Sequence, residues 1–350
     1  MQQALPKLYH ILMAMGVGAM VMGFASVRAD PAAPMQASYE NIAAIHIHDF
    51  IGTLLIERGG EAFSVRIDPS DEGGPLTLQQ NDQIIELQGE EGSVAKLYRL
   101  GSPLYQNGPW LEKLNGESRS MEDRFDIFLE SYPKVTITIP DEIDLLLDQS
   151  ALKLKADIEF KDVQFTDVFE IYGQLGPTKM ADLHLRGMGV LSMADVEEYM
   201  RVHIQGSAEI TAQNAGRAFL KVTGSGDIRM KTIQEQATIA LLGSGDIAVQ
   251  EALGGYDVHL RGSGDVVTDR INGPTRLEIL GSGSITVDEG RAEDLNARIL
   301  GSGDIEFGGM ATNPTIATQG SGRVTIDAYE GNANVTGLGK VFIGGTQIKN

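Results

Sequence analysis

The stretch ATIALLGSGDIAVQ at residues 237–250 interrupts an apolar run with Gly-Ser-Gly-Asp and then resumes it. The same phrase returns along the chain as LKVTGSGDIRM, VHLRGSGDVVT, LEILGSGSITV, ARILGSGDIEF and IATQGSGRVTI. The first glycines of these six triplets lie 19, 19, 19, 20 and 19 residues apart. A fixed period of about 20 residues is typical of repeat proteins, in which each repeat is one structural unit stacked on the next.

The repeats share a pattern of apolar positions around the triplet. With the first glycine as position zero, positions −4, −2, +4 and +6 are mostly apolar and the residues between them mostly polar. Alternation with a period of two predicts a half-buried strand on each side of the triplet. The triplet is then a corner between two strands, where glycine permits positive φ. The corner glycines are Gly224, Gly226, Gly243, Gly245, Gly262, Gly264, Gly281, Gly283, Gly301, Gly303, Gly320 and Gly322.

No repeat has room for a helix, so consecutive coils are expected to pair strand on strand. This predicts an all-β fold, a parallel β-solenoid with coils of about 19 residues. Degenerate copies at Gly187, Gly206 and Gly337 extend the repeats over residues 183–343. A phosphate-binding loop is the alternative for a single GSG, but it needs a helix N-terminus after the loop. A third inward column is expected near Ile233, Leu253, Ile271, Met310 and Tyr329.

Residues 1–29 have the features of a signal peptide. Lys7 precedes an apolar run at residues 8–24, and Val27 and Ala29 stand at −3 and −1 of a cleavage site. A membrane anchor is the alternative, with a run that is marginal for a span. Cleavage before Asp30 leaves 26 Lys+Arg (28 less Lys7 and Arg28) against 48 Asp+Glu, a net charge of −22. We therefore expect an exported protein, periplasmic or at the cell surface.

This acidity argues against nucleic acid or an anionic membrane as the partner. With no cysteine, the chain is held by burial and hydrogen bonds and not by disulfides. Residues 30–41 are predicted to be a linker, and residues 42–345 one solenoid domain with an insertion at 89–132. The insertion holds the candidate partner contacts Tyr98, Tyr105 and Trp110 and a predicted helix in GESRSMEDRFDIFLES. Such an insertion often caps a solenoid end.

The GSGDI coils, the strand DFIGTLLIERGG at 49–60 and the closing GLGKV at 337–341 resemble the auto-transporter adhesin head domain family (GIN domain). The resemblance covers nearly the whole mature chain, residues 42–345. It implies a right-handed, single-stranded parallel β-helix exported from a Gram-negative bacterium. The insertion at 89–132 departs from the family pattern.

Two outward columns could carry metal chemistry. Position −3 places His184 and His203 in adjacent coils, with His259 farther along, and stacked imidazoles could share zinc or copper. His46 and His48 form a second close pair. Position +3 is acidic, and its carboxylates either accept backbone N–H bonds in the turns or bind calcium weakly. The weak metal candidates are Asp227, Asp246, Asp265, His184 and His203.

These patterns predict an exported, non-enzymatic β-solenoid for adhesion-like binding or cell-envelope structure. The alternatives are a polysaccharide-active β-helix enzyme and a calcium-binding envelope protein, because fold alone does not decide function. The expected partner is an envelope or surface protein or a glycan. Self-association through the solenoid ends is also possible. No cofactor is expected beyond weak calcium.

Overall fold

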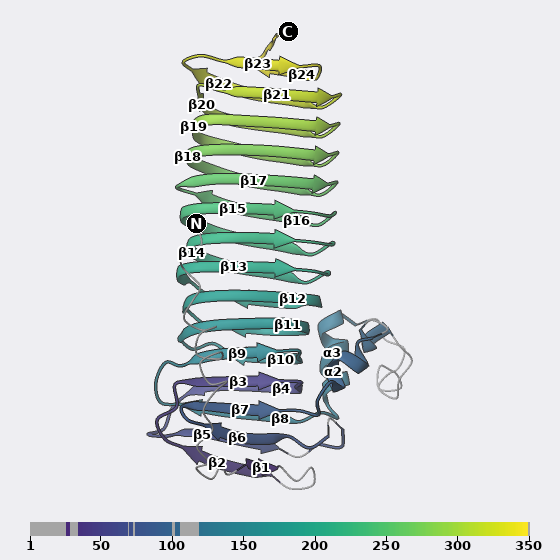
Figure 1. Ribbon diagram of the computed structural model, residues 1–350, viewed down its shortest axis with the longest axis vertical. Coiled ribbons are helices and arrows are strands. Elements are labelled where there is room, and N and C mark those ends of the chain that lie inside the picture. Colours follow the sequence, from purple (N-terminus) through teal and green to yellow (C-terminus); the bar gives the residue numbers. More distant parts are fainter. Residues whose placement is uncertain are drawn as a thin grey trace, which may run out of the picture.

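Figure 1 shows the computed structural model, which describes residues 26–28, 34–68, 70–72, 74–99, 102–105 and 119–348. The described residues form a rod of about 10 β-solenoid turns. Strands make up 69% of the structure and helices 6%, so the coils carry almost all of the regular backbone. The predicted all-β solenoid with coils of about 19 residues is confirmed.

Each coil has a first face before its corner and a second face after it. The first face begins with β3 (Ala44–His48), β9 (Asp144–Asp148) and the N-terminal half of β11 (Phe160–Leu175), which pair in parallel. The second face begins with β4 (Ile51–Arg58), β10 (Ala151–Ala156) and the C-terminal half of β11, again in parallel. The rod continues through β12 (Thr178–Met193), β13 (Val196–Ile204), β14 (Glu209–Val222), β15 (Asp227–Leu241), β16 (Asp246–Ala252), β17 (Gly255–Gly262), β18 (Asp265–Gly281), β19 (Ser284–Gly301), β20 (Asp304–Thr312), β21 (Thr315–Gly320), β22 (Arg323–Glu330), β23 (Asn334–Gly337), β24 (Lys340–Ile343) and β25 (Thr346–Ile348).

The parallel register stacks equivalent repeat positions on one another and forms the core. At position −2, Val222, Leu241, Leu260, Ile279 and Ile299 pair in succession, and all five are fully buried. Each such side chain contributes about 1.5–3 kcal/mol by leaving water. The alternation seen in the sequence therefore marks the interior correctly.

The first glycine of the triplet has positive φ in five of the six exact repeats, as at Gly224 (144°) and Gly281 (151°). The second glycine does not, so the predicted positive φ is wrong for it. Instead, a Cβ at Gly245 would lie 2.0 Å from the carbonyl oxygen of Gly226 in the preceding coil. Close approach of two backbones is what requires glycine there.

Two details of the predicted repeat differ in the structure. Ile233 and Ile271 are buried as predicted, but Leu253 and Tyr329 are exposed and Met310 is only partly buried. Their neighbours Ala252 and Ala311 are buried in their place, because one added residue switches the face of a strand. In the last coil Val335 pairs with Ile316. Val335 therefore occupies position −4 and not the predicted position −2, while Val341 keeps position +4. The last corner is two residues shorter than the repeat predicts.

Coils at the N-terminal end do not follow chain order. β7 (Ile84–Gln88) pairs with β3, and β8 (Lys134–Ile139) pairs with β4, on the edges opposite β9 and β10. The β3–β4 coil is therefore enclosed between two later coils. β5 (Phe63–Asp68) and β6 (Thr77–Asn81) continue the sheet as antiparallel strands on β8 and β7.

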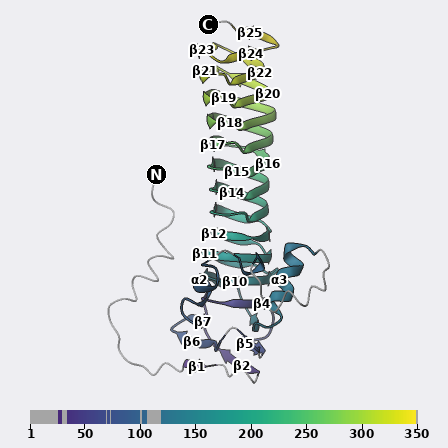
Figure 2. The ribbon, with the colours of Figure 1, turned by 90° about the vertical axis from the view of Figure 1, so that its right-hand side faces the viewer.

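The predicted insertion forms a helical cap between β7 and β8. Its elements are α2 (Ser93–Leu97), η1 (Pro103–Tyr105) and α3 (Met121–Leu129). α3 begins at a capping box, in which Ser120 accepts a hydrogen bond from the Asp123 N–H and the Asp123 carboxylate accepts one from Ser120 N–H. The cap lies against the flank of the rod at its corners and not over its end (Figures 1 and 2).

Most of the predicted signal peptide lies outside the described residues, and its cleavage stays a prediction. Within it, β1 (Ser26–Arg28) pairs antiparallel with β6. The predicted linker contains a strand, β2 (Met35–Tyr39), because its alternate residues Met35, Ala37 and Tyr39 pack against the core. In the part of the chain described, no helix has the length and hydropathy to cross a membrane.

Replacing Gly245 with valine should destabilise the rod by about 2 kcal/mol or more, because the new Cβ collides with the Gly226 carbonyl. The neighbouring exposed Ser244→Val is the matched control and should cost much less. Denaturant unfolding of the two variants measures the difference. Equal stability of Gly245→Val and the wild type would contradict the stacked corner.

Candidate functional site

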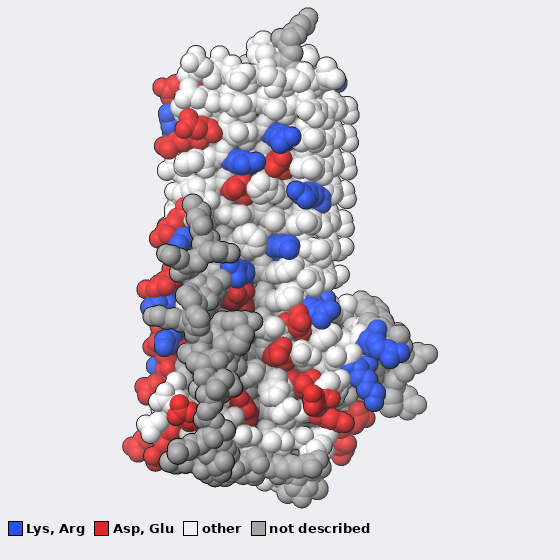
Figure 3. All heavy atoms as spheres, viewed as in Figure 1, with Lys and Arg blue, Asp and Glu red and all other residues white. Residues whose placement is uncertain are grey.

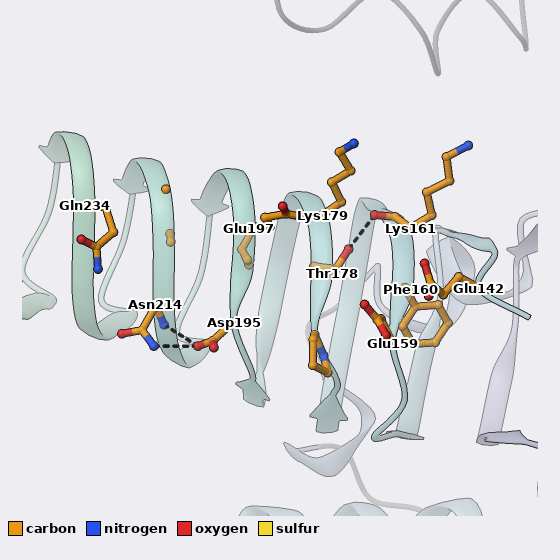
Figure 4. A pocket seen from close by; sticks show the side chains of 14 residues that line it. Glu142, Glu159, Phe160, Lys161, Thr178, Lys179, Asp195, Glu197, Asn214 and Gln234 are labelled. Atoms are coloured by element: carbon orange, nitrogen blue, oxygen red, sulfur yellow. Dashed lines mark hydrogen bonds between the residues drawn. The ribbon is translucent and has the colours of Figure 1, made fainter.

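A groove of about 510 Å³ opens where the chain leaves the second face of one coil for the first face of the next. It runs across consecutive coils from the start of β9 to β15 (Figure 4). Small residues such as Ala215 and Gly216 leave room beside longer polar side chains. The lining residues are Glu142, Glu159, Phe160, Lys161, Pro177, Thr178, Lys179, Asp195, Val196, Glu197, Asn214, Ala215, Gly216 and Gln234.

The groove presents charges of both signs. Lys161 and Lys179 project in the same direction from neighbouring coils (Figure 4). Lys179 pairs with Glu198 at 3.3 Å, but no hydrogen bond or ion pair joins the Glu159, Lys161 or Glu197 side chain to another described residue. These three side chains are exposed. Unpaired charges beside a hollow are available to a polar ligand.

Asn214 and Asp195 line the groove on neighbouring coils and are joined by hydrogen bonds. The Asn214 backbone N–H and side-chain Nδ2 both donate to Asp195 Oδ1, at 3.1 and 2.8 Å. The groove's aromatic residue, Phe160, is 1% exposed, so its ring packs inward and offers no stacking platform to a sugar. Recognition in this groove therefore depends on charge and hydrogen bonding.

Two buried carboxylates lie next to the groove. Asp144, at the start of β9, accepts a backbone hydrogen bond from Asp162 in the next coil, and both are more than nine-tenths buried. Burial, followed by the nearby Asp162 charge, raises the pKa of Asp144. Asp144 Oδ1 has no hydrogen-bond partner within the described chain. Two neighbouring carboxyl groups, one of them with a raised pKa, are candidates for acid–base chemistry.

The cap packs on the rod through a second apolar cluster. Ile51, Ala151 and Tyr172 of the second face meet Val94, Leu104, Phe125, Phe128 and Leu129 of the cap. The rings of Phe125 and Tyr172 lie 5.2 Å apart. Lys153 reinforces the contact from outside, donating to both carboxylate oxygens of Asp126 at 2.8 and 2.6 Å.

Glu170 lies under the cap with no exposed surface. Tyr98 Oη and Ser102 Oγ both donate to its Oε2, at 2.9 and 2.8 Å, and Oε1 has no partner in the described residues. Burial raises the pKa of Glu170 to about 7, and the two hydrogen bonds offset part of that rise. Glu170 is thus a polar anchor that holds the cap and resists ionisation.

The three predicted partner contacts lie in different surroundings, and their role in binding stays a prediction. Tyr98 is 8% exposed and faces Glu170, so in this conformation it packs the cap and offers no contact surface. Tyr105 lies in η1, and Trp110 falls outside the described residues. An aromatic cluster in an insertion is as compatible with internal packing as with binding, and the structure gives Tyr98 the packing role.

The acidic column links neighbouring coils through hydrogen bonds. Asp227 Oδ1 accepts from the Asp246 backbone N–H at 2.9 Å, and Asp246 Oδ1 accepts from Asp265 N–H at 3.2 Å. Asp265 does the same for Ser284 at 3.1 Å. The expected backbone partner thus belongs to the next coil and not to the same turn. The corner carboxylates therefore join successive coils by hydrogen bonds.

The histidine column is stacked as predicted. The rings of His184 and His203 lie 4.8 Å apart and within 10° of parallel. His184 Nδ1 contacts Asp167 at 3.0 Å, while burial, then Lys221 and His184, lower the pKa of His203 to about 4. His46 and His48 are 5.0 Å apart. Within the described chain, no three His, Cys, Asp or Glu side chains are grouped to hold a metal, so zinc or calcium at these columns stays a prediction.

No sequence pattern predicted the groove, because its residues come from the variable joints between coils. Glu170 was also missed, although it stands where the triplet serine stands in later coils, since it pairs with Met188 between Gly187 and Gly189. A glutamate at the corner position that holds serine in the six exact triplets marks the coil that carries the cap.

Replacing Glu170 with glutamine should remove a pH-dependent loss of stability. The folded pKa of about 7 lies above the ordinary 4.5, so the contribution of Glu170 to stability is fully present below pH 4.5, and about 3 kcal/mol of it is lost as the pH rises from 4.5 through 7. Glutamine still accepts from Tyr98 and Ser102 without ionising. Unfolding at pH 5 and pH 8 should therefore show the variant gaining on the wild type at pH 8. Exposed Glu306→Gln is the control, and equal pH dependence in all three proteins would refute the assignment.

Replacing Asp246 with alanine should lower the melting temperature by a few degrees, because the Asp265 N–H loses its acceptor. Asp246→Asn keeps an acceptor oxygen and should restore most of the loss. Melting in EDTA and in millimolar calcium should be nearly the same. A large calcium-dependent rise that both variants abolish would make this column a metal site instead of a brace.

One known protein family matches the C-terminal part of the rod. Residues 257–346 match the family described as "Putative auto-transporter adhesin, head GIN domain". A search of curated proteins finds no match. The matched segment begins within β17 and ends at the start of β25, and it contains four of the six exact triplets. The resemblance to the auto-transporter adhesin head domain family, which the repeated triplets predict, is therefore confirmed over residues 257–346.

Proposed function

We propose that the chain is an exported, non-enzymatic β-solenoid that binds a protein or glycan of the cell envelope through the polar groove. The family match and the β-solenoid fold fit a structural or adhesion module. The observation that carries the proposal is the row of exposed, unpaired charges at Glu159, Lys161 and Glu197 beside the hollow.

Export is part of the same proposal. Its support is the leader-like segment at residues 1–29 and the adhesin family of the C-terminal coils. The site of action is then the periplasm or the surface of a Gram-negative cell. A partner in that space meets a rod whose groove runs along several coils, which suits an extended polymer segment.

The alternative is a polysaccharide-active enzyme working in the same groove. Its specific support is the closeness of the Asp144 and Asp162 carboxyl groups, together with the raised pKa of Asp144, since paired carboxyl groups perform acid–base chemistry on glycosidic bonds. Against it stands the burial of both carboxyl groups. Binding without bond cleavage is therefore the preferred function.

Reversing two charges in the groove should abolish binding to the envelope. The variant Glu159→Lys/Glu197→Lys changes two unpaired groove residues, and Asp288→Lys/Glu306→Lys makes the same charge change at exposed positions of other coils. Cosedimentation with isolated Gram-negative envelopes measures binding. Protease or periodate treatment of the envelopes separates protein from glycan partners.

The groove variant should lose binding at least tenfold while the control binds like the wild type. Equal binding by all three proteins would place the contact elsewhere on the rod. Release of new reducing ends from the envelope glycan by the wild type would favour the enzyme instead.

A further inference from the structure

The cap covers part of an outward column of the rod that is open in later coils. Ala151 pairs with Ile51 in one neighbouring coil and with Glu170 in the other. Glu170 pairs in turn with Met188 of the next coil. The first three of these residues are buried, whereas Met188 is only partly buried. The serine at the equivalent corner position of a later coil, Ser263, is exposed. The cap, and not the rod, therefore shields position 170 from water.

The cap is a separate body on the flank of the rod. Its apolar residues belong to a cluster distinct from the core inside the coils. The chain enters and leaves the cap at two fixed points. At the first, the Gly89 N–H donates to the His48 carbonyl at 3.0 Å. At the second, the Thr53 N–H donates to the Pro133 carbonyl at 3.0 Å. Lifting the cap between these points breaks none of the ladders that hold the coils together.

Glu170 is a buried carboxyl group at the contact between cap and rod. Tyr98 and Ser102 of the cap both donate to its Oε2, and Oε1, which has no partner in the described chain, is left to carry the proton. Burial raises the pKa of Tyr98 well above its usual value, so Tyr98 remains a donor at neutral pH. An ionised Glu170 would place a charge, with one oxygen unbonded, beside an apolar cluster. The closed cap therefore favours the protonated carboxyl group.

Among the described residues, no cation is paired with Glu170. The cations on the elements around it bond to other groups or are exposed: Arg124 to the Leu104 carbonyl, Lys153 to Asp126, Arg186 and His184 to Asp167, and Lys96 and Arg99 to solvent. Tyr132 and Tyr172 are further titratable neighbours of Tyr98. On the face in view in Figure 3, basic side chains lie on the outer surface of the cap. An ionised Glu170 thus has no counter-charge bonded to it.

From these contacts we propose that the cap is a pH-dependent latch, which lifts from the flank of the rod when Glu170 loses its proton to water and closes again in acid. The coils stay folded in both positions of the cap. Lifting uncovers Ile51, Ala151 and Tyr172, and Tyr172 pairs with Val190, which is already 39% exposed. The open form therefore presents a longer apolar strip on the outside of the rod. The latch depends neither on the groove nor on export.

The direction of the pH dependence follows from the change in surroundings of Glu170. Burial raises its pKa to about 7 in the closed cap. In the open cap its position is exposed, as Ser263 is, so the pKa returns toward 4.5. The contribution of Glu170 to closure is therefore fully present below pH 4.5 and is lost as the pH rises through 7. Between those values the ratio of open to closed cap rises about tenfold per pH unit.

Hydrogen–deuterium exchange with mass spectrometry measures how often the cap opens. The whole chain is compared with Glu170→Gln and with Glu170→Ser, which introduces the residue of the exact triplets. Neither variant ionises at this position. Glu306→Gln, at an exposed glutamate of β20, is the matched control. Exchange is followed in α2, in α3 and in the remote strand β18 from pH 5.5 to pH 8. Dividing the wild-type rate by the variant rate at each pH removes the intrinsic pH dependence of amide exchange.

The ratio for α2 and α3 should rise at least tenfold from pH 5.5 to pH 8 against both Glu170 variants. The ratio for β18 should stay constant, and Glu306→Gln should exchange like the wild type throughout. If glutamine or serine loosens the closed cap, the ratio is shifted by one factor at every pH and its rise is unchanged.

A ratio for α2 and α3 that is the same at pH 5.5 and pH 8 would overturn the proposal. An equal rise in β18 would also overturn it, because the rod and not the cap would then be opening. A similar rise against Glu306→Gln would assign the effect to surface charge and likewise exclude the latch.

Discussion

The rod depends on how closely consecutive coils approach at the glycine corner. The Ser244 N–H donates to the Gly224 carbonyl of the preceding coil at 3.0 Å, and the same bond recurs at Ser263 and Ser282. These bonds require the corners of successive coils to lie directly over one another, at the strand spacing of about 4.8 Å. Any Cβ at Gly245 would separate the corners, and with them the ladders on both faces. The period of 19 residues is the length that returns the chain to this point.

The same corner position serves two purposes along the rod. In the later coils it holds small, exposed serines such as Ser263 and Ser302. At Glu170 it carries a buried carboxyl group that receives hydrogen bonds from the cap. The cap therefore docks where the corner is not built from Gly-Ser-Gly, and a helical element is added without disturbing the stacked coils above it. The groove lies at the joints between coils, where the backbone is under less constraint.

Much of the fold is encoded in short-range pattern and was predictable. Alternation around the triplets identifies buried residues such as Ile239 and Ile285, because a strand with one face inward must alternate. The coil order at the N-terminal end was not predictable, since the pairing of β7 with β3 joins segments of equal pattern and only three-dimensional packing selects the partner. The groove and the Glu170 anchor depend on side chains from distant coils meeting in space, which periodicity does not encode. The family resemblance supplied the adhesin expectation but named no site.

The enclosed position of the β3–β4 coil has a mechanical consequence. Tension applied to the C-terminal side meets β25 and then β24, each an edge strand whose release breaks a single ladder, so the coils can be stripped one after another. Tension applied to the N-terminal side frees β1 and β2, each of which is paired on one edge, and then meets β3, which is hydrogen-bonded to β7 on one edge and β9 on the other. Two ladders must yield there at once. The rod is therefore anchored more firmly at its N-terminal side, and under load it unravels from the C-terminal side.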